Sequence, residues 1–135
     1  MLVRGADSFS RWLTSLRLDA KSNNPNNTAA RVARLRLDRI NAFLLVLSRM
    51  QAVPTADDPP VIKRIRQSSR YELWRLGHPH HSEVCVRLIV HFHASEAVVA
   101  LVGGDKLRVS DQWYDTAVKQ ANAALDHYYR QREVS

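Results

Sequence analysis

The spacing of the apolar residues changes twice along this chain of 135 residues, and these changes constrain the fold more than any other feature. Apolar residues recur at helical spacing from about residue 7 to residue 50, and again from Gln112 onward. Between about residues 61 and 104 they recur at every second position, as in β-strands. The connecting segment "QAVPTADDPP" (residues 51–60) holds three prolines and no apolar period, so we expect a loop there. The expected fold class is α+β.

The two N-terminal helical segments carry recognisable start and stop signals. Asp7 or Ser8 can cap a first helix, which should end at the turn-forming segment "SNNPNN" (residues 22–27). Asn27 or Thr28 can cap a second, longer helix. Before the first helix, Leu2 and Val3 could begin an edge strand. An arginine row on the second helix is interpreted as a solvated or partner-facing surface, and consists of Arg31, Arg34 and Arg39.

Four alternating segments predict an antiparallel meander. They are residues 61–67, 71–78, 83–94 and 96–104. We expect the helices to cover one face of this small twisted sheet. A loop of ten residues does not require a domain boundary, so the prediction is a single domain over residues 1–135.

The third alternating segment, "EVCVRLIVHFHA", has two different faces. One face is purely apolar and should form the core: Val84, Val86, Leu88, Val90 and Phe92. The other face mixes charge with imidazole: Cys85, Arg87, Ile89, His91 and His93. Because burying an unpaired arginine costs several kcal/mol, we expect this second face to form an open concavity. The alternative is an ion pair between Arg87 and Glu72 of the neighbouring strand.

The charge balance favours a polyanionic partner. Lys and Arg number 20 against 13 Asp and Glu, which gives a formal net charge of +7. The alternative is that this positive charge only keeps the protein soluble. Several basic residues could line the concavity and bind RNA: Lys63, Arg64, Arg66, Arg70 and Arg75, with Lys106 and Arg108 at its rim. Trp113 and Tyr114 would stand at the start of the last helix and offer aromatic surface for stacking. Of the two, Tyr114 is interpreted as the site residue, and Trp113 as a core residue that holds the helix in place.

Other chemistries are disfavoured. Cys85 is the single cysteine, which excludes an internal disulfide and a cysteine-based zinc site, and its apolar surroundings favour a buried thiol. The segment "HPHH" (residues 78–81) is typical of a solvated turn, and His91 and His93 lack an evident third metal ligand. We expect no metal and no cofactor. The sequence shows no signal peptide and no membrane span, so a cytoplasmic location without a membrane partner is expected.

Several segments, taken in order, resemble the RelE/HigB family of bacterial toxins, of the addiction-module killer type. These are "FSRWLTSLR", "RVARLRLDRI", "RYELWRL", "VRLIV", "GGDK" and "QWYDTAV", and the resemblance runs from about residue 9 to residue 128. It implies an N-terminal helical hairpin packed on a small twisted antiparallel sheet, followed by a C-terminal helix. It also implies a ribosome-dependent, metal-independent mRNA endonuclease of a type II toxin–antitoxin system.

The resemblance implies roles for particular residues. Arg87 would contact the scissile phosphate, Arg108 would stabilise charge near the cut, and Tyr114 would act on the 2′-hydroxyl or stack on a base. A pair of lysines on the RelE strand is replaced here by other residues, so the general base or acid is left open among three candidates: Glu72, His91 and His93. The implied partners are the ribosome, mRNA and a cognate antitoxin of helix-turn-helix type.

Two alternatives stay open at this point. ParE toxins share the fold but inhibit DNA gyrase without cleaving RNA. A non-catalytic basic module that binds nucleic acid would carry the same charge pattern.

Overall fold

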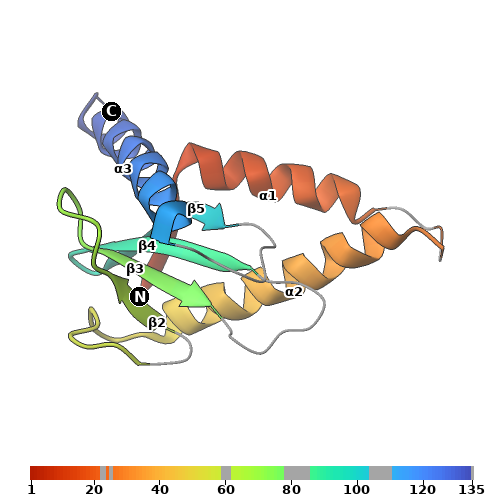
Figure 1. Cartoon of the computed structure of the whole chain (residues 1–135), viewed down its shortest axis with the longest axis horizontal. Coiled ribbons are helices and arrows are strands. Elements are labelled where there is room, and N and C mark those ends of the chain that lie inside the picture. The colour runs from red at the N-terminus through yellow and green to blue at the C-terminus, as the bar shows by residue number, and fades with distance from the viewer. Residues whose placement is uncertain (22–23, 25, 59–61, 78–85, 104–110, 135) are drawn as a thin grey trace.

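The structure is a computed structural model that describes residues 1–21, 24, 26–58, 62–77, 86–103 and 111–134. Over these residues the α+β prediction is confirmed, with three helices and one five-stranded sheet (Figure 1). The elements in chain order are β1 (Leu2–Gly5), α1 (Asp7–Asp19), α2 (Thr28–Arg49), β2 (Ile62–Ile65), β3 (Leu73–Gly77), β4 (Arg87–His93), β5 (Glu96–Gly103) and α3 (Asp111–Val134).

The sheet is mixed, with the strand order β1-β5-β4-β3-β2. Strands β2 to β5 form the predicted antiparallel meander. Strand β1 lies parallel to β5, with Leu2 opposite Glu96 and Gly5 opposite Val99. The prediction of a purely antiparallel sheet is therefore wrong, since the apolar period of a strand does not encode the direction of its neighbour.

The N-terminal helical hairpin is also not found as predicted, because the chain begins with a strand. β1 is hydrogen-bonded into the sheet before α1 starts, and α1 and α2 then connect it to β2 at the opposite edge (Figure 1). The start of α2 is confirmed: the Asn27 side chain accepts a hydrogen bond from the Ala30 N–H at 3.0 Å. The cap of α1 is Ala6, one residue earlier than predicted.

Helices cover both faces of the sheet, and each face has its own core. On one face, α1 and α2 pack through Phe9, Leu16, Ile40, Phe43 and Leu47 against Trp74, Leu76, Leu88 and Val90. On the other face, α3 packs through Ala117, Val118, Ala121 and Leu125 against Ile65, Leu73, Ile89, Val98 and Ala100. The small alanines of α3 let its backbone approach the strands closely.

The prediction that helices cover one face is therefore wrong. The face of β4 that carries Arg87 is not an open concavity throughout, because α3 lies over its middle and Ile89 there is wholly buried. Arg87, His91 and His93 lie towards the two ends of the strand, and all three keep some exposure. In the part of the chain that the structure describes, no helix is both long enough and apolar enough to span a bilayer.

Strand β2 is one edge of the sheet, and part of that edge is covered by the loop before it. Asp58 and Ile62 exchange two backbone hydrogen bonds, of 2.9 and 3.1 Å. The Asp57 carboxylate accepts a hydrogen bond from the Arg64 N–H at 2.8 Å. These bonds satisfy backbone groups that an edge strand would otherwise leave open.

Candidate functional site: a cationic pocket at the start of the last helix

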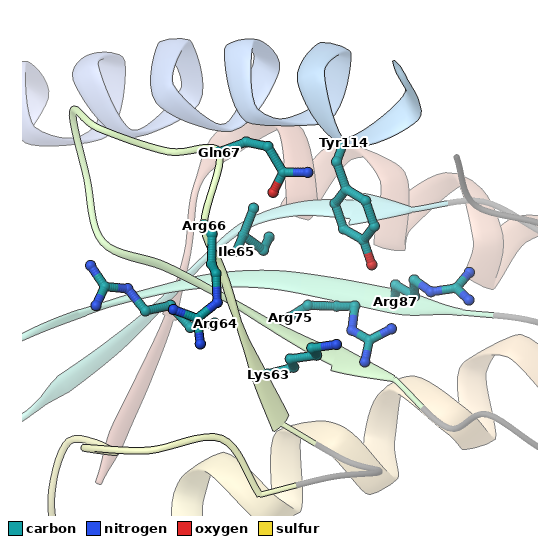
Figure 2. Close-up of a pocket in the computed structure, with 8 residues that line it drawn as sticks. All are labelled: Lys63, Arg64, Ile65, Arg66, Gln67, Arg75, Arg87 and Tyr114. Carbon is teal, nitrogen blue, oxygen red and sulfur yellow. The ribbon is translucent and has the colours of Figure 1, made fainter. Parts of the chain in front are cut away.

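A pocket of about 450 Å³ opens between β2, β3, the start of β4 and the first turn of α3 (Figure 2). We call it the cationic pocket; its lining residues are Lys63, Arg64, Ile65, Arg66, Gln67, Arg75, Arg87 and Tyr114. Five of these are lysine or arginine, and no carboxylate is among the described residues that line it. Such a concentration of positive charge favours an anionic ligand.

The register of the strands brings three of these cations together. Lys63 lies opposite Arg75 across β2 and β3, and Gly77 lies opposite Arg87 across β3 and β4. Because paired residues project to the same face of a sheet, Lys63, Arg75 and Arg87 stand side by side. In Figure 2 the Tyr114 hydroxyl points from α3 towards Arg75 and Arg87, while Arg64 and Arg66 extend on the other side of β2.

Gly77 leaves space for the side chains of Arg75 and Arg87. A Cβ atom at this position would lie 3.3 Å from Cγ of Arg87 and 3.9 Å from Cδ and Cζ of Arg75. The two side chains therefore pack over a bare stretch of backbone, and a larger residue would displace Arg87 first. Sequence reasoning missed Gly77, although a glycine within a strand is a known signal of close approach.

The cations are partly withdrawn from water. Arg75 and Arg87 are half-buried, whereas Lys63, Arg64 and Arg66 are exposed. The Nε atom of Arg75 is buried and has no hydrogen-bond partner among the described residues. Cations that share a half-buried site repel one another, so an anion bound between them would lower their energy.

Tyr114 closes the pocket on the side of α3. It is half-buried, and its ring packs against the core beneath this helix. It lies in the first turn, where the backbone N–H groups add positive potential. Its hydroxyl can donate or accept a hydrogen bond, unlike the guanidinium groups, which only donate.

The structure brings together six of the predicted site residues, namely Lys63, Arg64, Arg66, Arg75, Arg87 and Tyr114. Lys106, Arg108, Cys85 and residues 78–81 lie outside the described residues, as does the side chain of Trp113. The predictions that fall on these residues stay predictions.

Glu72 lies on the opposite face of the sheet from the cationic pocket. Its carboxylate accepts a hydrogen bond from the Trp74 indole N–H at 3.2 Å, and Trp74 belongs to the core beneath α1 and α2. The alternative of a pair between Glu72 and Arg87 is wrong, because Gly77, at the other end of β3, is the residue opposite Arg87.

His91 and His93 lie at the far end of β4 from Arg87. They join an aromatic cluster, in which the His91 ring lies 5.2 Å from Tyr71 and the His93 ring 5.6 Å from Tyr129. Nδ1 of His91 is 3.0 Å from the backbone oxygen of Glu72. None of the three candidate acid or base residues therefore lines the cationic pocket.

Arg70 was expected to line the concavity, and this expectation is wrong. Its guanidinium pairs with the Asp126 carboxylate at 2.7 Å, and the Tyr71 hydroxyl donates to the same oxygen at 2.6 Å. The Tyr71 hydrogen bond, followed by Arg70, lowers the pKa of Asp126. These contacts attach the loop after β2 to α3, so Arg70 has a structural role.

No metal centre is found in the described part of the chain, where no group of three or more His, Cys, Asp or Glu side chains could hold an ion. Comparison with protein-family models found no matching family, and no similar protein was found among curated proteins or solved structures.

Proposed function

We propose that this chain is a toxin of the RelE/HigB type that cleaves mRNA on the ribosome. The observation that carries the proposal is the convergence of Lys63, Arg75, Arg87 and Tyr114 on one pocket. Two of these residues, Arg87 and Tyr114, are those to which the family resemblance gives roles. The proposed partners are mRNA, the ribosome and a cognate antitoxin, and the proposed location is the cytoplasm.

The pocket suits a phosphodiester that is under attack by its own 2′-hydroxyl. In this reaction the 2′-oxygen bonds to phosphorus, the 5′-oxygen leaves, and a cyclic phosphate and a 5′-hydroxyl result. Negative charge grows on the non-bridging oxygens in the transition state. Arginine and lysine donors fixed around that position stabilise this charge, which lowers the barrier. Gly77 leaves room for Arg75 and Arg87 to lie close together around that position.

Tyr114 is proposed to act on the attacking hydroxyl. Among the described lining residues, Tyr114 carries the one hydroxyl group, whose oxygen can both accept and donate a hydrogen bond. In Figure 2 its hydroxyl points towards the arginines, where the phosphate would lie. Arg108 is proposed to add charge stabilisation.

A second candidate function is favoured by the chemistry that the pocket lacks. No carboxylate and no imidazole lines it among the described residues, and these are the usual general bases. A basic module that binds single-stranded nucleic acid without cleaving it needs only cations and aromatic surface. The two functions share the binding step and differ in the fate of the RNA.

The deciding experiment is induced expression in bacteria, with primer extension on cellular mRNA. The nuclease predicts growth arrest and new 5′ ends inside codons, both lost in Arg87→Ala. Arg17→Ala removes the same charge from an exposed position on α1 and should stay toxic. Growth arrest with intact mRNA and DNA damage would instead indicate a gyrase inhibitor. Normal growth with intact mRNA would leave the binding module.

A further inference from the structure

A second pocket, of about 560 Å³, lies on the other side of β2. We call it the flanking pocket; it is lined by loop residues 54–57, Arg64, Arg66, Glu72 and Trp74. Arg64 and Arg66 line both pockets. A ligand held in the cationic pocket can therefore continue into the flanking pocket past these two arginines.

The position of β2 makes this path geometrically direct. Lys63 lies opposite Arg75 on the α3 side of the sheet, and the next residue, Arg64, lies opposite Trp74. Successive side chains of a strand point to opposite faces, and the loop covers the edge of β2 at Ile62 and Arg64. A chain that crosses this edge near Arg66 passes from one pocket to the other. Figure 2 shows the Arg64 and Arg66 side chains on the side of β2 away from Lys63 and Tyr114.

The flanking pocket differs from the cationic pocket in charge, because it contains two carboxylates. Asp57 accepts the hydrogen bond from the Arg64 N–H and has Arg66 at 3.9 Å. Glu72 is exposed and accepts one hydrogen bond, from Trp74. A carboxylate has about four acceptor sites, so Glu72 retains capacity for further donors. The two carboxylates balance the charges of Arg64 and Arg66, so the flanking pocket favours a second phosphate less than the cationic pocket does, and Glu72 offers acceptors to a group with N–H donors.

We propose that the flanking pocket binds the base next to the phosphate in the cationic pocket, and that Glu72 selects bases with donor groups. This inference rests on the proposed binding of RNA. Guanine fits best, since its N1–H and N2–H groups stand side by side and match the two oxygens of one carboxylate. Cytosine offers its N4 amino group to the same acceptor. Uracil places carbonyl oxygens on both sides of its single N–H and is disfavoured.

The test is fluorescence anisotropy with two labelled RNAs, a short oligouridine and the same oligomer with one central guanosine. The wild-type protein should bind the guanosine RNA about tenfold more tightly. In Glu72→Gln the preference should fall to about twofold, while affinity for oligouridine is retained. The glutamine oxygen can still accept from Trp74, so the fold is preserved. Glu133→Gln, which removes the same charge from an exposed residue of α3, should keep the tenfold preference.

The possible failures are distinguishable. Equal affinity of the wild-type protein for both RNAs would overturn the inference about Glu72 and leave RNA binding intact. A guanosine preference that persists in Glu72→Gln would overturn it equally. If neither RNA binds the wild-type protein, the inference fails, whereas the proposed cleavage on the ribosome is decided separately by growth arrest and primer extension.

Discussion

The two ends of the face that α3 covers are built in opposite ways. At the end where α3 begins, five cations line the cationic pocket, and no carboxylate is among the described residues that line it. At the end where α3 finishes, cations have carboxylate partners: Arg70 pairs with Asp126 and Arg132 with Glu96, each at 2.7 Å. Both ends border the same core, so packing alone does not explain the difference.

The comparison indicates which end is structural. At the C-terminal end the ion pairs and the ring contacts of Tyr71, His91, His93 and Tyr129 join α3 to the loops around β3 and β4. At the N-terminal end five cations line one pocket, although Arg66 has the Asp57 carboxylate 3.9 Å away. Like charges placed this closely repel one another, which costs stability, and an anionic ligand would lower that cost. Natural proteins accept such a cost mainly at functional sites.

The largest expected effect comes from reversing charge at one end or the other. Arg75→Glu places a carboxylate among the remaining cations, and we expect affinity for single-stranded RNA to fall by about a hundredfold. Arg130→Glu makes the same change on the exposed side of the C-terminal end and should alter affinity by about threefold or less. Anisotropy titration measures both. Equal losses in the two variants would show that RNA binding follows net charge and has no particular site.

A smaller effect is expected from filling the space under the arginines. Gly77→Val would push Arg87 out of position, because a Cβ atom there already lies 3.3 Å from Cγ of Arg87. We expect RNA affinity to fall about tenfold, since misplacement of a contact residue weakens binding without removing charge. Gly77→Ala should fall between this variant and the wild type. Unchanged affinity in a folded Gly77→Val protein would mean that the placement of Arg87 is unimportant.

At the structural end the effect should be on stability at high pH. Burial raises the pKa of Tyr129 to about 12, and its hydroxyl is buried without a hydrogen-bond partner among the described residues. The unfolded chain ionises tyrosine near pH 10, so the folded state loses stability as the pH rises from about 10 to about 12. This loss is on the order of 2 kcal/mol. In Tyr129→Phe the decline in the urea unfolding curves should be smaller but not absent, because burial also raises the pKa of Tyr71. A decline equal to that of the wild type would contradict the assignment.

The smallest effect should appear in acid. Because the pKa of Asp126 is lowered in the folded state, its contribution is present above the unfolded pKa and is lost as the pH falls through the folded value. Thermal unfolding from about pH 5 downwards should show a smaller loss in Asp126→Asn than in the wild type. RNA affinity at neutral pH should be the same in both proteins. A loss of affinity would contradict the separation of the two ends.

The element order and much of the site were predictable from the sequence, because both depend on local pattern. The change of apolar period located the helices and the four meander strands. The alternation of side chains along the β4 segment placed Arg87 and Ile89 on one face, and the positive charge of residues 63–66 identified one wall of the pocket. The start of α2 at Asn27 also followed from local chemistry.

The remaining features depend on register and on long-range packing, which a single sequence does not encode. The parallel pairing of β1 with β5 joins opposite ends of the sequence. The position of α3 over Ile89 divided the expected concavity into two ends. From the sequence, Glu72 was a candidate partner of Arg87, and Arg70 was expected in the same concavity. The pairing of β3 with β4 instead places both of them away from Arg87.

The central claim is that the cationic pocket binds the phosphates of single-stranded RNA, and the salt dependence of binding tests it most directly. For single strands the slope of log affinity against log salt concentration changes by about 0.7 for each phosphate contact. The wild-type protein, Arg87→Ala and Arg17→Ala would be titrated with one RNA over a series of salt concentrations. The account predicts that Arg87→Ala lowers the slope by about 0.7, whereas Arg17→Ala keeps the wild-type slope. Identical slopes and affinities in all three proteins would contradict it.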